Sequence, residues 1–408
     1  MAGAEARMLD GITVLDFTQY LAGPTVTRFM AEMGATIIKV EMAPNGDPGR
    51  LLPYYRAADG RSVYHVQQNR GKKSLCLDFS RPETADLIRE LVATVDVVVE
   101  NFGPGVLEKR GLDWPSLSAV NPRLVMASIS AFGRTGPMAH KVGFDLIAQA
   151  FSGIMHMTGD PDDAPSFVAA GIADVSTGVH AFGAIGWALL HRDRTGKGTW
   201  IDLAMVDCMY AMHEANVQYY AATNGAVEPK RFGRWNRLAG PYGVYKGPTG
   251  WLVILALERQ WPNLCQALGQ PELEHDPRFE TLALRGQNAA DLAAIIEAWM
   301  ATFPDDKAAL DALDAARVPC GPVQSIADTV TSPHYLARDM VRTLEDPYYG
   351  TVTIPGFPLK FSDQPPLPDL KAALLGEHNG EVLRDRLGWS DAQIRDLEAR
   401  GVLRTGPI

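Results

Sequence analysis

The chain has 408 residues, with 38 Lys and Arg against 48 Asp and Glu, which gives a formal net charge of −10. This acidic surplus argues against a nucleic-acid-binding protein, because such proteins usually carry a basic surplus. A local basic patch could still bind a phosphorylated ligand. At roughly 100–200 residues per domain, the length allows two or three domains.

Cysteine spacing and apolar runs favour a cytoplasmic protein. The four cysteines are far apart and no two form a C-x-x-C pair, so neither a disulfide framework nor a zinc site is expected. The first residues contain no apolar core of signal-peptide length. No apolar run reaches the ~18 residues of a membrane span.

Short apolar runs alternate with helical stretches in the N-terminal part of the chain. Strands are expected at residues 12–17, 36–41, 74–79, 96–100 and 124–128, with helices at 25–33 and 85–95. This alternation predicts an α/β fold whose parallel sheet is covered by helices on both faces. Ligands bind at the carboxyl ends of the strands in such sheets, so the loops there are the first candidates for a site.

The character of the sequence changes near Asn224. Before it, helices are expected at 144–155, 176–191 and 206–222, with a strand at 200–204. The helix at 176–191 is apolar nearly all round, so it is expected in the interior. After Asn224, a hairpin at 241–257 and helices over 261–317 indicate a second, smaller α/β domain, and a polar helix is expected at 390–400.

Several common site signatures are absent. The loop after the first strand has no G-x-G-x-x-G, and the chain contains no P-loop, H-E-x-x-H or G-x-S-x-G motif. The nine histidines do not pair at metal-ligand spacing. A nicotinamide-binding or ATP-hydrolysing sheet and a metal site are therefore not expected.

Asp174 is a carboxylate among small and apolar neighbours, just ahead of the helix expected to be buried. One interpretation is a helix N-cap, since Asp is a preferred residue at that position. The other is a carboxylate nucleophile, because small neighbours would admit a bulky thioester and a helix N-terminus would help to keep the group ionised. The local pattern by itself favours the cap.

Two turns could bind a phosphorylated ligand. In the glycine-containing turn at 101–105, Phe102 could stack on a flat ring, and Lys109 and Arg110 follow it and could pair with phosphates. The basic turn at 69–74 suits a solvated surface or a phosphate clamp equally well. Its candidate side chains are those of Arg70, Lys72 and Lys73.

The remaining charged candidates have weaker support. An arginine cluster, formed by Arg231, Arg234 and Arg237, could hold a carboxylate or phosphate or could form an exposed face. Four further residues are interpreted as structural, namely Glu41, His65, His140 and Asp145.

Ten segments, in order along the chain, resemble the family III CoA-transferases, the CaiB/BaiF-like family of formyl-CoA transferase and carnitine CoA-transferase. They are LDGITVLDFTQYLAGP (9–24), GATIIKVE (34–41), GDPGR (46–50), NRGKKSLCLDF (69–79), DVVVENFGPG (96–105), GFDLIAQAFSGIMHMTG (143–159), GIADVSTGVHA (171–181), RTGKGTWIDLAM (194–205), VPCGPV (318–323) and LLGEHNGEVL (374–383). The resemblance covers nearly the whole chain.

The resemblance implies an interlocked homodimer in which a Rossmann-like large domain is built from both chain ends. It places the large CoA-binding domain at 1–223, the small domain at 224–325, and a linker with the C-terminal part of the large domain at 326–408. Acyl-CoA and a small carboxylic acid would be substrates, with no permanently bound cofactor, no nucleic acid and no membrane partner.

The resemblance also implies that Asp174 is the nucleophile of acyl-CoA:carboxylate CoA transfer. It would form an aspartyl anhydride with the acyl group and then an aspartyl-CoA thioester. Some members supply oxyanion donors from a mobile glycine-rich loop, and the nearest match here is the segment at 238–241.

CoA contacts carry over where the residues match. Ala22, Asn101 and Phe102 match the family, and Lys109 replaces its usual arginine with the charge retained. Met42 stands where formyl-CoA transferase has an arginine, and Leu21 replaces a glutamine. Phosphate charge could come instead from Arg70, Lys72 and Lys73.

Two other activities are compatible with the resemblance. An α-methylacyl-CoA racemase-like isomerase needs a His–Asp pair from a G-H-D segment, but here the segment is Gly143-Phe144-Asp145, and Phe144 cannot transfer a proton. A non-catalytic CoA-binding subunit of a hetero-oligomer would not need Asp174. Succinyl-CoA and a dicarboxylic or hydroxy acid are common family substrates, and Arg50, Arg56 or the arginine cluster could hold a second carboxylate.

Overall fold

The computed structural model describes residues 6–52, 62–347, 349–368 and 370–406. Contacts within the chain divide it into two units. The first comprises Met1–Ile154, Ala169–Glu214 and His334–Ile408, and the second comprises Met155–Val168 and Ala215–Pro333. The division thus assigns residues 155–168 to the second unit, although the expected small domain began at Asn224.

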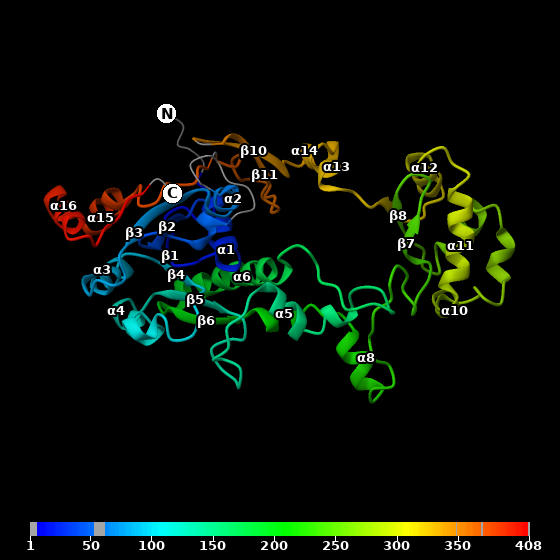
Figure 1. The fold of residues 1–408 in the computed structure, drawn as a ribbon, viewed down its shortest axis with the longest axis horizontal. Helices are drawn as coiled ribbons and strands as arrows, with labels where there is room; N and C mark the ends of the chain where they lie inside the picture. The colour runs from blue at the N-terminus through cyan, green and yellow to red at the C-terminus, as the bar shows by residue number, and fades with distance from the viewer. Residues whose placement is uncertain (1–5, 53–61, 348, 369, 407–408) are drawn as a thin grey trace. The chain divides into compact units, whose positions relative to one another are not determined.

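The first unit is built on a six-stranded sheet in the order β3-β2-β1-β4-β5-β6, with every neighbouring pair parallel (Figure 1). Its strands are β1 (Thr13–Asp16), β2 (Thr36–Met42), β3 (Lys72–Leu77), β4 (Val97–Glu100), β5 (Val125–Ser130) and β6 (Thr199–Ala204). This confirms the predicted parallel α/β architecture. The strand order reverses between β1 and β4, which is where such sheets bind ligands.

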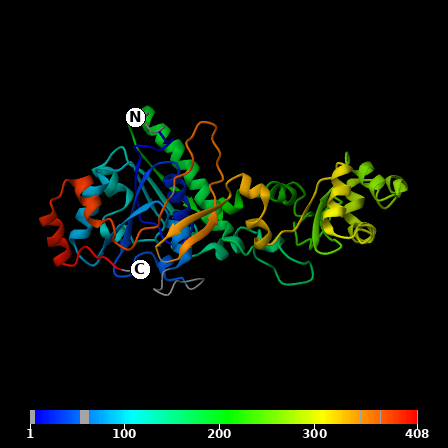
Figure 2. The same ribbon diagram turned by 90° about the horizontal axis from the view of Figure 1, so that it is seen from above.

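Helices cover both faces of the sheet, which explains why the strands are apolar without alternation. On one face, α1 (Ala22–Glu32) and α6 (Ile172–Thr195) pack on alternate side chains of β1, β4 and β5. The other face is covered by helices from both ends of the chain: α3 (Glu83–Val92), α4 (Trp114–Val120), α15 (Asn379–Leu387) and α16 (Asp391–Ala399). Figure 2 shows the C-terminal helices, in red, beside the blue and cyan N-terminal elements.

The helix expected at 206–222 is interrupted. The structure has α7 (Met205–Tyr210) and α8 (Asn216–Ala222), with a break between them. The polar helix at the C-terminus is confirmed, and it starts with a capping box in which Ser390 and Gln393 bond reciprocally.

The second unit has its own core. Its antiparallel sheet has the order β7-β8-β9, with β7 (Tyr242–Lys246), β8 (Trp251–Leu255) and β9 (Cys320–Pro322). The main helices packed on it are α9 (Trp261–Ala267), α11 (Ala289–Met300) and α12 (Asp306–Ala315). A sheet with helices on it agrees with the second α/β domain predicted from the sequence.

Short elements complete the described chain. They are η1 (Pro48–Leu51), α2 (Val63–Asn69), η2 (Glu108–Arg110), α5 (Asp145–Phe151), η3 (Met155–Met157), η4 (Pro271–His275), α10 (Leu282–Gln287), α13 (Ile326–Val330), α14 (Pro333–Ala337), β10 (Val341–Asp346) and β11 (Gly350–Pro355). None of the helices within the described ranges is both long enough and apolar enough to cross a membrane.

Candidate active site

Three segments that are distant in sequence meet at the carboxyl end of the sheet, where the loop after β1, the loop after β4 and the first turn of α6 enclose a cavity of about 210 Å³. The cavity brings together Asp174, Ala22, Asn101 and Phe102, all of which were candidates from the sequence. The other lining residues are Gln19, Tyr20, Leu21, Gly103, Pro104, Ile129, Ser130, Ala131, Lys141, Val142, Gly143, Phe144 and Met205.

A close helix–helix contact holds Asp174 beside the loop after β1. At Gly178, one turn after Asp174, α6 lies so near α1 that a Cβ atom would come within 2.7 Å of the Ala22 carbonyl oxygen and 2.8 Å of the Thr25 Cβ. Contacts this short are possible only without a side chain. Gly178 therefore allows the start of α6 to lie against the start of α1, which places the carboxylate in the cavity.

Asp174 is the third residue of α6, and its side chain does not cap the helix. The N-cap position is Gly171, which has no side chain to accept the first amides. The N-cap interpretation of Asp174 is therefore wrong. Among the described residues, none donates a hydrogen bond to the Asp174 carboxylate, so it is available to react.

Burial and the neighbouring Asp145 carboxylate raise the pKa of Asp174 to about 7. This differs from the expectation that the helix N-terminus would keep the group ionised. Desolvation penalises the charged form, and a like charge adds to that penalty. A carboxyl group that titrates near neutral pH is typical of an active site.

Asp145 supplies the cap that Gly171 lacks. Its Oδ1 accepts hydrogen bonds from the backbone N–H groups of Ala173, at 2.7 Å, and Asp174, at 3.2 Å. Its Oδ2 accepts a bond of 2.6 Å from Gln149 Nε2. The structural role predicted for Asp145 is thus to cap the first turn of α6.

The loop after β1 is fixed by side chains from neighbouring strands. The Asn101 side chain accepts from Gln19 N at 2.7 Å and donates to Gln19 O at 2.8 Å. Tyr20 has a φ of 62°, a region that is costly for a residue with a side chain, and its N–H donates to Asp47. Asn101 therefore shapes the loop with both ends of its amide group.

Buried ion pairs beneath the surface of the sheet edge also support the loop after β1. Lys39 Nζ lies 2.9 Å from Asp47 Oδ2 and donates to the Thr18 carbonyl, and Lys72 Nζ lies 3.0 Å from Asp16 Oδ2. Burial lowers the pKa of Lys72 to about 8, although Asp16 partly offsets this effect. With 3% of its surface exposed, Lys72 cannot reach a phosphate in solvent, which argues against its predicted role in CoA binding.

The other basic candidates do not share one surface. Arg70 is buried and pairs with Glu32, so its predicted phosphate contact is also unsupported. Lys73 is half-buried and lies 2.6 Å from Glu381. Lys109 is exposed, and Arg110 contacts the Phe79 ring and donates to the Val106 carbonyl, so these two remain candidates near the Phe102 turn.

Several lining residues were not among the predicted site residues, and Lys141, Tyr20 and Phe144 are the ones with charged or aromatic side chains. Lys141 is the only lysine or arginine that lines the cavity within the described residues, and its position just before Gly143-Phe144-Asp145 was a usable signal. Tyr20 packs edge-on against Phe144, with ring centroids 5.8 Å apart. Phe144, whose side chain cannot transfer a proton, has 63% of its surface exposed.

The proposed second-carboxylate ligands are mostly engaged elsewhere. Arg50 is buried against Glu41, at 2.7 Å, so it is structural, and Arg56 lies outside the described residues. Arg231 donates to the carbonyl oxygens of Asp160 and His156.

The rest of the arginine cluster contacts its own unit. Arg234 pairs with Glu297 at 3.0 Å, and Arg237 lies over the Trp235 ring. Arg231 and Arg234 thus make structural contacts within the second unit, while Arg237 is exposed.

The segment at 238–241 does not present free amides. Leu238 N and Ala239 N both donate to Asn236 Oδ1, and Gly240 N donates to the Leu282 carbonyl. Pro241 has no N–H. The segment therefore offers no oxyanion donors in this structure.

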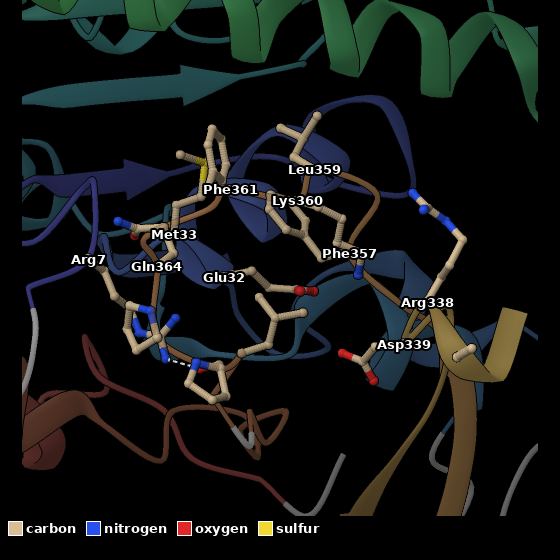
Figure 3. A pocket seen from close by; sticks show the side chains of 14 residues that line it. Arg7, Glu32, Met33, Arg338, Asp339, Phe357, Leu359, Lys360, Phe361 and Gln364 are labelled. Atoms are coloured by element: carbon tan, nitrogen blue, oxygen red, sulfur yellow. Dashed lines mark hydrogen bonds between the residues drawn. The ribbon is translucent and has the colours of Figure 1, made fainter.

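A larger cavity of about 420 Å³ lies elsewhere in the first unit (Figure 3). It lies between the end of α1 and the segment after β11, and Arg7, which lines it, donates to the Pro366 carbonyl. Glu32 in its wall is already paired with Arg70 and Arg342. The cavity contains none of the residues near Asp174, so its size does not make it the catalytic centre.

Known proteins resemble this chain over nearly its full length. Residues 9–379 match the model of CoA-transferase family III. A succinyl-CoA–D-citramalate CoA-transferase of Chloroflexus aurantiacus is 36% identical over 97% of this chain and 98% of its own. A succinyl-CoA:mesaconate CoA-transferase of Haloarcula hispanica is 39% identical over 92% of this chain and 95% of its own.

Solved structures agree with these matches. A CAIB/BAIF family protein from Brucella suis is 36% identical, covers 94% of this chain and 100% of its own, and superposes with a TM-score of 0.82. The hypothetical protein Rv3272 from Mycobacterium tuberculosis is 29% identical, with 93% of this chain and 100% of its own covered and a TM-score of 0.80. These matches, together with the cavity around Asp174, show that the chain belongs to CoA-transferase family III and is a CoA-transferase.

Proposed function

We propose that this enzyme transfers CoA from succinyl-CoA to a dicarboxylic acid, with Asp174 as the covalent nucleophile. The observation that supports this assignment most directly is the Asp174 carboxylate, which lines the cavity with no hydrogen-bond donor from the described residues. A carboxylate that is not engaged by protein donors is the group needed to attack a thioester.

The proposed reaction has four steps. The Asp174 carboxylate attacks the thioester carbonyl and expels CoA thiolate, which leaves an acyl-aspartyl anhydride. The thiolate attacks the aspartyl carbonyl, so that succinate leaves and an aspartyl-CoA thioester forms. The acceptor carboxylate attacks this thioester and releases the thiolate again. The thiolate then attacks the acceptor's acyl carbonyl, which gives the new acyl-CoA and frees Asp174.

Binding energy from CoA is expected to drive these steps. A carboxylate is a weak nucleophile in water, but holding it beside the thioester removes the entropy cost of their encounter. Ala22 and Phe102 in the cavity wall are proposed to contact CoA, and Lys141 and Lys109 are proposed to face its anionic groups. Asn101 contributes by shaping the loop at Gln19.

The substrates are proposed from the relatives. Curated relatives include CoA-transferases named for succinyl-CoA with citramalate, glutarate or mesaconate. Each of these acceptors is a dicarboxylic acid, which favours a dicarboxylic acceptor over formate or a long-chain acid.

The decisive experiment measures transfer of CoA from succinyl-CoA to isotopically labelled acids. Wild-type enzyme should label at least one dicarboxyl-CoA, and mass spectrometry should detect a CoA adduct on the peptide that contains Asp174. Asp174→Asn should abolish both signals, whereas Asp193→Asn at the far end of α6 should retain them. Transfer that survives Asp174→Asn would refute the nucleophile, and activity confined to monocarboxylic acids would refute the substrate class.

We also propose that two copies of the chain form a homodimer through α6. This helix exposes Val179, Trp187 and Leu190, with exposed fractions of 47%, 73% and 39%. Gly183 and Gly186 lie among them, with open space where a side chain would be. An exposed apolar stripe of this length is typical of a protein–protein contact.

A further inference from the structure

Two carboxylates meet at the start of α6, namely Asp174 of α6 itself and Asp145, the first residue of α5, although one would suffice as a nucleophile. Asp145 Oδ1 occupies the amides of Ala173 and Asp174, and its charge lies beside the Asp174 side chain. A neutral Ser or Asn could accept the same hydrogen bonds. The hydrogen bonds of Asp145 and its negative charge can therefore have separate effects on Asp174.

We propose that Asp145 is a positioning residue for the nucleophile, which fixes the first turn of α6 and confronts the resting Asp174 carboxylate with a like charge. This inference rests on the proposed role of Asp174 as nucleophile. It assigns Asp145 a part in the reaction without contact to the substrate.

The geometry supports the fixing role. Gly171 at the N-cap leaves the first amides of α6 without a local acceptor, and Asp145, the first residue of α5, supplies one. The bond to Ala173 is short at 2.7 Å, and Gln149 holds the other carboxylate oxygen at 2.6 Å. Asp145 thus fixes the backbone around Asp174, and Gln149 in turn fixes the Asp145 side chain.

The charge has a separate consequence. When Asp174 attacks a thioester, its oxygen bonds to the acyl carbon, the C–S bond breaks, and the electron pair goes to sulfur. Asp174 becomes part of a neutral anhydride, so its repulsion by Asp145 ends. Asp145 therefore disfavours the free Asp174 anion relative to the acylated residue, which promotes the covalent step.

Other ionisable groups near α6 do not replace Asp145. The elements packed on α6 carry Arg28 and Glu32 (α1), Asp202 (β6), and Asp207, Cys208 and Tyr210 (α7). Tyr20 and Lys141 line the cavity. The helix α6 itself carries His180, His191, Arg192, Asp193 and Arg194. Among all groups in the described ranges, Asp145 is the one whose charge, after burial, raises the pKa of Asp174.

The test compares Asp145→Asn with Asp145→Ala in the full-length enzyme. Asparagine keeps an oxygen for the two amides but removes the charge, whereas alanine removes both. Wild-type kcat/KM should fall below about pH 7, because Asp174 must be ionised to attack. In both variants this fall should move to lower pH by about one unit or more.

The plateau of kcat should separate the two roles. Asp145→Ala should lower it by roughly 10-fold to 100-fold, since a displaced nucleophile misses the near-attack geometry. Asp145→Asn should recover most of that loss, while KM for succinyl-CoA should change by less than about twofold in both, because Asp145 does not touch CoA. Asp207→Asn removes a neighbouring charge at an exposed position of α7 and should leave the pH profile unchanged.

An unchanged pH profile in Asp145→Asn, or equal kcat in the Asn and Ala variants, would overturn the inference. The Asn variant decides the question even if the Ala variant does not fold. If Asp174→Asn abolishes transfer while the Asp145 variants behave as wild type, only this inference fails. If Asp174→Asn remains active, the proposal that Asp174 is the nucleophile is refuted, and the inference about Asp145 falls with it.

Discussion

At the scale of single residues, the site depends on carboxylates in contrasting surroundings. Asp174 is largely buried and lies beside the Asp145 carboxylate, and both effects raise its pKa to about 7. Glu41 is also buried, yet the Arg50 guanidinium lowers its pKa to about 2, with help from Lys39 and the Asp47 amide. The same side-chain chemistry is thus reactive in one place and structural in the other.

Glu41→Gln should destabilise the fold by about 3 kcal/mol at pH 7, because it removes the carboxylate charge that faces the buried Arg50 guanidinium. The folded pKa of about 2 lies below the ordinary value, so the stabilisation is present above about pH 4.5 and is lost as pH falls toward 2. Urea unfolding followed by tryptophan fluorescence should therefore show a large difference between variant and wild type at pH 7 and a smaller one near pH 3. The exposed Glu398→Gln is the control, and an equal effect of both substitutions would contradict the assignment.

At the scale of elements, the loop between β1 and α1 is the part of the site that other segments hold most firmly. Asn101 comes from the end of β4, Asp47 from the end of β2, and Lys39 from β2 itself. The strand order β2-β1-β4 places these ends on both sides of the loop. The loop is thus shaped by its neighbours in the sheet.

Asn101→Ala should raise KM for succinyl-CoA by roughly 10-fold, because it removes two hydrogen bonds that hold Gln19, each worth about 1 kcal/mol. The rate of the chemical step should change less, because Asp174 lies on a different element. Steady-state kinetics would show this split. Asn121→Ala is a matched control, since its amide bonds to the Val92 and Val95 carbonyls away from the cavity. A fall in kcat alone would contradict the loop-shaping role of Asn101.

At the scale of the whole molecule, the apolar exposed face of α6 favours pairing of two chains. The sequence predicted that this helix lies in the interior, but a single chain leaves Trp187 with 73% of its surface exposed. Both observations agree if a second copy covers the helix, since an apolar helix is stable in water only when its surface is buried.

Sedimentation should therefore give the wild-type enzyme a mass of about twice 44.4 kDa. Trp187→Glu should shift the enzyme toward monomer, because it places a charge in the proposed contact. Val120→Glu, at an exposed position of α4, should leave the mass unchanged. A wild-type monomer would rule out the proposed pairing.

The sequence determined the architecture and four residues of the cavity wall, including the proposed nucleophile. Apolar strands without alternation require burial on both faces, so the parallel sheet followed from the pattern alone. The ordered motifs placed Ala22, Asn101, Phe102 and Asp174 in one family site, and the fold brings these four to one cavity.

Only the tertiary structure decided how those residues are used. Burial separated Lys72 from solvent, and Gly171 together with Asp145 showed that Asp174 is not a cap. A hydrogen bond between Asp145 and Ala173, 28 positions apart, leaves no local trace in the sequence. Solvent exposure, pKa and long-range capping depend on which segments pack together, and packing is a property of the folded chain.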